Sequence, residues 1–205
     1  MSWAVLSMII LGFALLSFFW RFEKRDVSPK EIALISTMAS MAAISRVLFA
    51  AIMNVQPTTF VVMITGYVFG PHTGFVVGAI AALVSNFFLG QGPWTPWQMF
   101  SWGMCGVSAG LLAGIQKGFK PGRFTVLAGL WGYVFGWIMN IWHWTAFVYP
   151  LNWKTFVATY AASFPFDTLH AAGNVVFALI FGQSFYYTLS RFRKKISVKY
   201  IDDLS

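Results

Sequence analysis

The feature that most constrains this chain is a succession of long apolar runs separated by short polar links. The first run, residues 3–20, is uninterrupted and is about as long as one membrane crossing requires. Only 10% of the 205 residues are charged, whereas a soluble domain carries about 25%. The sequence therefore predicts an all-α integral membrane protein.

The apolar runs predict seven helices. The expected spans are residues 3–20, 29–52, 58–69, 73–89, 97–115, 124–148 and 164–191, with an outer loop at residues 149–163. The expected division is an additional N-terminal transmembrane helix with its linker (1–28), a six-helix membrane domain (29–195) and a cytoplasmic tail (196–205). Residues 58–69 would form a helix of about 18 Å, too short for a hydrocarbon core of about 30 Å. Together with the next helix it would either leave room for a cavity at the outer side or be tilted and covered by its neighbours.

Most basic residues lie in three clusters between or after the apolar runs. Twelve of the fourteen Lys and Arg residues fall in residues 21–30, 117–123 and 191–199, and the other two are Arg46 and Lys154. If the clusters face the cytoplasm, the positive-inside rule is satisfied. This predicts a multi-pass plasma-membrane protein with its N-terminus outside and its C-terminus in the cytoplasm. The net charge of +8 then reflects contact with the lipid bilayer, and no nucleic-acid partner is expected.

The sequence lacks the common motifs of nucleotide hydrolysis and metal catalysis. It contains no G-x-x-x-x-G-K-[ST] loop, no H-E-x-x-H or G-x-S-x-G motif, and no paired-cysteine metal pattern. The one cysteine, Cys105, lies in an apolar run, where such a residue is usually a small hydrophobe. We therefore expect no ATP hydrolysis by this chain alone, no metal site and no enzymatic activity.

An unusual loop, residues 90–98 (GQGPWTPWQ), joins two of the apolar runs. Two prolines stiffen it, two glycines allow close backbone approach, and its tryptophans and glutamines offer apolar bulk and amide groups. Such a loop is suited to cover a small-molecule pocket. Anchoring in the membrane interface explains the tryptophans equally well.

Further polar and aromatic residues are expected on the same outer side. Together with the loop they predict an outward-facing hollow lined by aromatic and amide groups, which suits a bulky, largely neutral ligand. The residues that we expect to bind substrate are Asn54, Gln56, Gln91, Trp94, Trp97, Gln98, Asn140, Trp142, His143, Asp167 and His170.

Two charges lie within the expected helices, away from their cytoplasmic ends. Arg46 and Asp167 would both lie in the outer half of the membrane, where a charge usually finds a partner inside the protein. An ion pair between them is a candidate structural clamp, and either one is a candidate ligand contact. His143, Asp167 and His170 would also allow a metal site or acid–base chemistry, but hydrogen bonding to a polar ligand is the favoured interpretation.

A small-residue face lies on the helix expected at residues 29–52, where Ala39 and Ala43 are four residues apart. Small residues at this spacing allow another helix to approach closely. The same spacing serves ordinary packing within one chain. The face is therefore a candidate surface for a partner or for a neighbouring helix.

Four segments give the sequence a family resemblance. They are Ala39 with Ala43, residues 54–60 (NVQPTTF), residues 64–71 (ITGYVFGP) and residues 83–100 (LVSNFFLGQGPWTPWQMF). The sequence resembles S components of energy-coupling factor (ECF) vitamin transporters over about residues 30–195. It is most similar to the group assigned to cobalamin, and residues 83–100 carry that similarity.

The resemblance implies a six-helix substrate-binding subunit that captures a vitamin from outside for ATP-driven uptake. Its partners would be a transmembrane coupling subunit, contacted by the face of Ala39 and Ala43, and two ATPase subunits. The transported ligand would be cobalamin or a related corrinoid, and no catalytic cofactor is implied. The additional helix at residues 3–20 departs from the six-helix pattern.

Residue chemistry alone leaves other functions open. Aromatic and amide groups also suit riboflavin, folate or a queuosine precursor. A membrane-embedded enzyme would use His143, Asp167 and His170. A structural membrane protein would use the tryptophans only as anchors and would have no hollow on its outer side.

Overall fold

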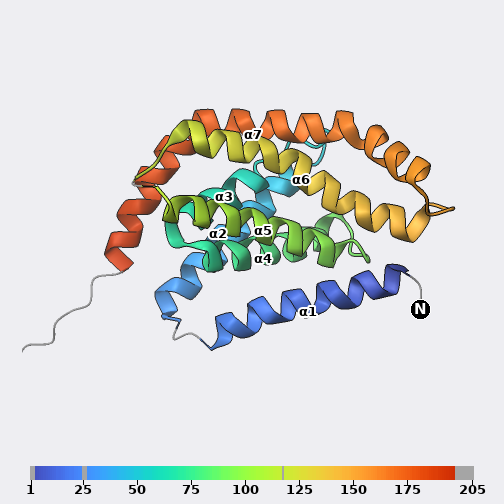
Figure 1. Cartoon of the computed structure of the whole chain (residues 1–205). Helices are drawn as coiled ribbons and strands as arrows, with labels where there is room; N and C mark the ends of the chain where they lie inside the picture. Colours follow the sequence, from blue (N-terminus) through green and yellow to red (C-terminus); the bar gives the residue numbers. More distant parts are fainter. Residues whose placement is uncertain (1–2, 25–26, 117, 197–205) are drawn as a thin grey trace, which may run out of the picture.

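The computed structural model describes residues 3–24, 27–116 and 118–196, and these residues form seven α-helices (Figure 1). The helices are α1 (Trp3–Glu23), α2 (Pro29–Leu48), α3 (Thr58–Phe69), α4 (Pro71–Leu89), α5 (Thr95–Gly114), α6 (Pro121–Phe147) and α7 (Trp153–Ile196). The described part of the chain contains no β-strand. The predicted all-α architecture is confirmed.

Four of these helices, α2, α4, α6 and α7, are each long and apolar enough to cross a membrane. The apolar parts of α1 and α3 are shorter, at residues 5–20 and 58–69. Several crossings in one chain make this a multi-pass membrane protein, because apolar helices of about 20 residues match the thickness of a bilayer.

Basic side chains gather at one end of the bundle, where Arg193 of α7 donates a hydrogen bond to the Val68 carbonyl at the end of α3 (2.8 Å). At the same end, the Tyr67 hydroxyl donates to the Gly118 carbonyl between α5 and α6 (2.8 Å). We call this the basic end. The opposite end holds the connections at residues 49–57, 90–94 and 148–152, and we call it the tryptophan end.

The helix α7 begins earlier than expected, so the predicted outer loop at residues 149–163 is wrong for its last eleven residues. Its first turn is capped by Asn152, whose side-chain oxygen accepts a hydrogen bond from the Thr155 amide (3.0 Å). The helix continues through Pro165, which lacks an amide hydrogen. Figure 1 shows that α7 curves along its length.

The short helix α3 lies at the centre of the fold. Eleven of its twelve residues are buried, and it packs against α2, α4, α5 and α7. A helix of about 18 Å cannot cross the bilayer unaided. It is covered by its neighbours, which is one of the two arrangements that its length allows.

Glycines allow α3, α4 and α5 to cross in close contact. A methyl group added to Gly106 of α5 would lie 2.7 Å from the Gly74 Cα of α4, and one added to Gly74 would lie 2.6 Å from the Gly66 Cα of α3. These distances are shorter than any real carbon contact. The three backbones therefore meet at one point that only glycine permits.

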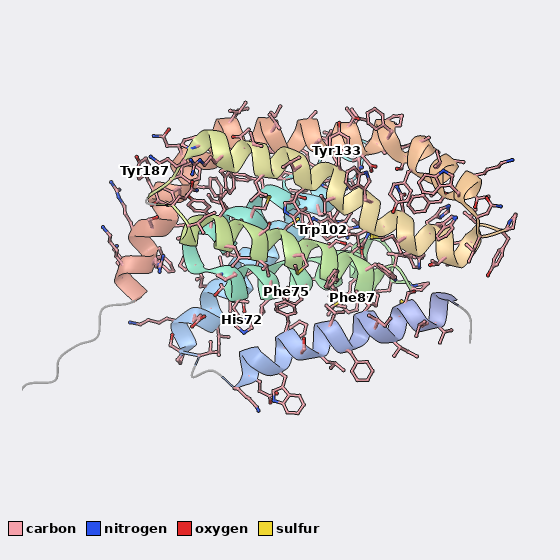
Figure 2. The ribbon with its side chains drawn as sticks, viewed as in Figure 1. His72, Phe75, Phe87, Trp102, Tyr133 and Tyr187 are labelled. Carbon is pink, nitrogen blue, oxygen red and sulfur yellow. The ribbon has the colours of Figure 1, made fainter. Side chains whose placement is uncertain are left out.

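The additional helix α1 lies along α4, α5 and α6 at the side of the bundle (Figure 1). Its buried Leu11 and Leu15 pack in a cluster with Phe75 and Trp97, and its Phe18 ring stacks on Phe75 with 3.8 Å between centroids. Figure 2 shows Phe75 lying between α4 and α1. The opposite side of α1 is exposed and apolar, as in a helix that faces lipid.

Candidate functional site

The loop between α4 and α5 is held by its own polar side chains. Thr95 donates its hydroxyl hydrogen to the Gln91 amide oxygen (2.9 Å), and the Gln91 amide nitrogen donates to the Leu83 carbonyl (2.9 Å). Gly90 adopts a φ of 107°, which favours glycine. We call residues 90–94 the roof loop, and its shape is fixed against α4.

The Arg46 guanidinium lies in the interior below the roof loop. Its Nη1 donates to Ser85 Oγ (2.7 Å) and to Asn86 Oδ1 (2.6 Å), both on α4. Its Cζ lies 4.7 Å from the centre of the Trp102 ring on α5, a cation–π contact. The side chain is 8% exposed, and its Nε is buried without a hydrogen-bond partner.

The predicted ion pair between Arg46 and Asp167 does not form in the described residues. Arg46 is directed towards α4 and α5, whereas the Asp167 carboxylate packs against Gly136 of α6. Both side chains lie in the tryptophan half of the bundle, as their depth in the sequence predicts. The two side chains do not meet because Arg46 leaves α2 towards α4 and α5, whereas Asp167 leaves α7 towards α6.

A hydrogen-bonded relay joins α5, α3 and α7 through the centre of the bundle. Trp102 Nε1 donates to Thr59 Oγ1 (3.0 Å), and this hydroxyl lies 2.9 Å from His170 Nε2. The other ring nitrogen of His170, Nδ1, is buried and has no partner. Figure 2 shows Trp102 in the interior, between the helices that this relay connects.

A second polar chain runs along α6 and α7. Asn140 donates to Ser163 Oγ (2.6 Å), and Ser163 donates to the Asp167 carboxylate (2.9 Å). Asp167 is 4% exposed and lies one turn before His170 on α7. The two polar chains therefore reach neighbouring turns of α7, one from α6 and the other from α3.

A groove of about 500 Å³ opens between α6 and α7 beside this second chain. Its lining includes Asn140, His143, Thr155, Thr159, Ser163 and Phe166. Thr155, Thr159 and Ser163 recur every four residues and so form one polar face of α7. We call this the α6–α7 groove, and its volume lies within the usual range for small-molecule sites, about 300–1,000 Å³.

The predicted substrate-binding residues fall into separate groups. Asn140 and His143 line the α6–α7 groove, the buried Asp167 accepts from the lining Ser163, and His170 is buried against Thr59 of α3. Gln91 and Gln98 hold the roof loop, and Gln56 is half-buried in the connection after α2.

The predicted aromatic residues and Asn54 also occupy different places. Trp94 meets Trp142 edge to face at 6.0 Å, which links the roof loop to α6. Trp97 is buried in the cluster beneath α1. Asn54 has a φ of 56°, and its side chain donates to the Phe166 carbonyl on α7 (2.8 Å).

His143, Asp167 and His170 have different neighbours and do not form one catalytic group. His143 packs against Trp142 and Phe147, Asp167 accepts from Ser163, and His170 contacts Thr59. In the described part of the chain, no cluster of three His, Cys, Asp or Glu residues could hold a metal ion.

Sequence reasoning missed the residues that connect the site. Asn86 is the junction: it accepts from Arg46 and donates to Thr95 (2.9 Å) and Gln98 (2.8 Å). Thr59 and Ser163 likewise join two other polar groups each. The sequence did offer a signal for Asn86, because it is an amide within the apolar run of residues 73–89 and buried polar groups in membranes need partners.

Ala39 and Ala43 lie inside the bundle, 1% and 2% exposed. They serve packing within the chain, because Ala39 belongs to the main core cluster. Ser36 and Ser40 of α2, by contrast, are exposed. They line a shallow surface groove of about 680 Å³ together with Thr37, Met41, Ile44 and Leu48, which we call the α2 groove.

Two substitutions of Asn86 should separate its two roles. Leucine should lower the free energy of unfolding by about 3 kcal/mol, since the buried Arg46 loses a charge-assisted hydrogen bond. Aspartate keeps an acceptor for Arg46 and loses the donor to Thr95 and Gln98. We expect N86D to unfold near the wild-type temperature with faster hydrogen exchange in the roof loop. Equal exchange in N86D and the wild type would contradict the junction role.

Comparison with known proteins places this arrangement in a family. A family model described as ECF-type riboflavin transporter, S component, matches residues 26–189, well over half of the chain. No curated protein and no solved structure matches the chain significantly. S components are substrate-binding subunits of transporters and not enzymes, and the family implies association with ECF transmembrane and ATPase components. The chain therefore belongs to the S components of ECF-type transporters, in the family described as the riboflavin type.

Proposed function

We propose that this subunit captures a vitamin at the tryptophan end and delivers it to an ECF coupling subunit and two ATPases. The observation that carries the proposal is the α6–α7 groove, where hydrogen-bonding side chains lie over the buried Asp167. The roof loop contacts α6 through Trp94 and Trp142. The groove gives a small polar molecule a place to bind.

The proposed orientation places the tryptophan end outside the cell. The described basic side chains at the start of α2, the start of α6 and the end of α7 lie at the other end, which supports a cytoplasmic position by the positive-inside rule. The described exceptions are Lys154 at the tryptophan end and Arg46 in the tryptophan half of the bundle. The N-terminus would then lie outside and the C-terminus inside.

We propose cobalamin or a related corrinoid as the cargo. The similarity of residues 83–100 to the cobalamin-type group supports it, and those residues form α4's end, the roof loop and the start of α5. A corrinoid is several times larger than a flavin, so the roof loop, α6 and α7 would have to separate to admit it.

Riboflavin is the second candidate cargo. The description of the matched family names riboflavin, and a groove of about 500 Å³ suits a flavin without rearrangement. The two candidates make opposite predictions about motion. A corrinoid requires the roof loop to move, whereas riboflavin requires little change.

Calorimetry of the purified full chain with a vitamin panel tests the proposal. We expect one of cobalamin, cobinamide or riboflavin to bind with a Kd of about 1 µM or tighter, equivalent to about −8 kcal/mol. Folate and a queuosine precursor serve as the comparison ligands. Absence of heat with every member of the panel, in protein that unfolds cooperatively, would overturn vitamin capture.

We propose the α2 groove as the surface for the coupling subunit. Its exposed Ser36 and Ser40 are four residues apart, which allows a partner helix to approach closely. Replacing Ser40 by leucine should reduce co-purification with the coupling subunit at least about tenfold, while cargo binding stays unchanged. The matched control is Ala172→Leu, at an exposed small residue of α7. Equal losses in both variants would contradict this surface.

A further inference from the structure

We propose that Arg46 binds an anionic oxygen group of the cargo, a phosphate or a carboxylate. The inference rests on the proposed function and narrows its substrate class. Arg46 contacts α4 and α5 and does not line the α6–α7 groove, so the anionic group would be held apart from the part of the cargo seated in that groove. It follows from the hydrogen-bond donors of the guanidinium, from the charges around it and from its link to the roof loop.

The guanidinium has one edge without a protein partner. Arginine carries five N–H donors, and both hydrogens of Nη1 are used by Ser85 and Asn86. Nε is buried without a partner, and the hydrogen bonds of Arg46 to described residues both come from Nη1, with none from Nη2. Nε and Nη2 lie on the same edge of the planar group, which matches two oxygens of a phosphate or carboxylate.

Among the described residues, the Arg46 guanidinium contacts only neutral groups. Its contacts are a hydroxyl, an amide oxygen and the face of Trp102. Among the described acidic residues, Glu23 and Glu31 lie near the basic end, and Asp167 is held by Ser163. A buried cation with no counter-charge is costly in a membrane protein. An anionic ligand group would supply the missing charge.

A second unpartnered donor lies on the same polar relay. The Thr59 hydroxyl accepts from Trp102, so its single hydrogen is directed to His170 Nε2. This arrangement assigns the remaining ring hydrogen of a neutral His170 to Nδ1, which is buried without a partner. The interior below the roof loop is therefore rich in donors, which favours an acceptor-rich ligand group.

Arg46 is also connected to the roof loop. Asn86 accepts from Arg46 with its oxygen and donates to Thr95 and Gln98 with its nitrogen. An anion bound to Arg46 would therefore act on the residues that hold the roof loop. Recognition of the charged group and closure of the roof are linked through one amide.

The experiment compares ligands that differ by a phosphate. Binding of riboflavin and flavin mononucleotide, and of cobinamide and cobinamide phosphate, is measured by calorimetry in a neutral detergent. We expect the phosphate-bearing member of the accepted pair to bind wild-type protein about 10- to 100-fold tighter, as for one charge-assisted hydrogen bond. In Arg46→Gln the two members should bind alike, Arg46→Lys should retain part of the difference, and the exposed control Lys154→Gln should retain all of it.

A second measurement needs no cargo. Inorganic phosphate, compared with chloride at equal ionic strength, should raise the unfolding temperature of the wild type and of K154Q but not of R46Q. The anionic group at Arg46 could also come from a phospholipid headgroup. Phosphorus analysis of the purified protein tests this, since a bound phospholipid would stay with the wild type and be lost from R46Q.

The outcomes separate this inference from the proposed function. Tight binding of both members of a pair with equal affinity would overturn the role of Arg46 and leave vitamin capture standing. A phosphate shift that depends on Arg46, with no vitamin bound, would support the anion site and overturn vitamin capture. Phospholipid retained only by the wild type, with equal binding of the pair, would assign the site to lipid and overturn the cargo contact.

Discussion

Replacing Gly106 by alanine is expected to destabilise the protein severely. The new methyl group would meet the backbone of Gly74, which cannot rotate away as a side chain can. Overpacking of this kind costs about 1–3 kcal/mol or more, and the better helix propensity of alanine returns only about 1 kcal/mol. We expect a cost at the upper end of that range, because the crossing joins α3, α4 and α5. The unfolding temperature should fall by about 5–10 °C.

The chain offers a matched control on the same helix. Gly114 lies eight residues after Gly106, and a methyl group added there would meet no atom within 4 Å. Gly114→Ala should leave the unfolding temperature unchanged or raise it slightly. A similar fall in both variants would show that the effect comes from α5 itself and would contradict the close crossing.

Replacing Trp102 by alanine should have an effect of similar or greater size. The side chain is 2% exposed, and its loss would create a cavity beside Phe135, remove the donor to Thr59 and leave Arg46 without its aromatic contact. Truncation of a buried aromatic residue costs about 3–5 kcal/mol. Thermal unfolding followed by tryptophan fluorescence should show a fall of about 8–16 °C.

Two further variants test whether Trp102 acts through its contacts. Trp102→Phe keeps most of the volume and loses the donor to Thr59, so its effect should lie between wild type and alanine. Trp137→Ala removes a tryptophan that is 50% exposed and should cost less than about 1 kcal/mol. An equal loss in W137A and W102A would contradict a central role for this indole.

The positions of most helices could be predicted because an apolar run of membrane length has few other stable conformations. The start of α7 was the main error. Residues 153–163 mix aromatic and hydroxyl side chains, which resembles a loop in composition. A helix was indicated by the four-residue spacing of Thr155, Thr159 and Ser163. In the structure all three line the α6–α7 groove.

The contacts of the site could be predicted only in part. Sequence position gives the depth of Arg46 and Asp167 in the membrane, but rotation about the helix axis decides which neighbour each side chain meets. Arg46 meets α4 and α5, and Asp167 meets α6 and α7. The same limit applies to Ala39 and Ser40, since adjacent residues on α2 face opposite environments.

The near-complete burial of α3 bears on how the protein is assembled during synthesis. Only one residue, Gly70, separates α3 from α4, and eleven of twelve α3 residues are covered by protein. A segment this short gains little from lipid when it first leaves the ribosome. Its insertion must therefore wait for α4, and the pair would enter the bilayer as a helical hairpin that closes only when α5 arrives.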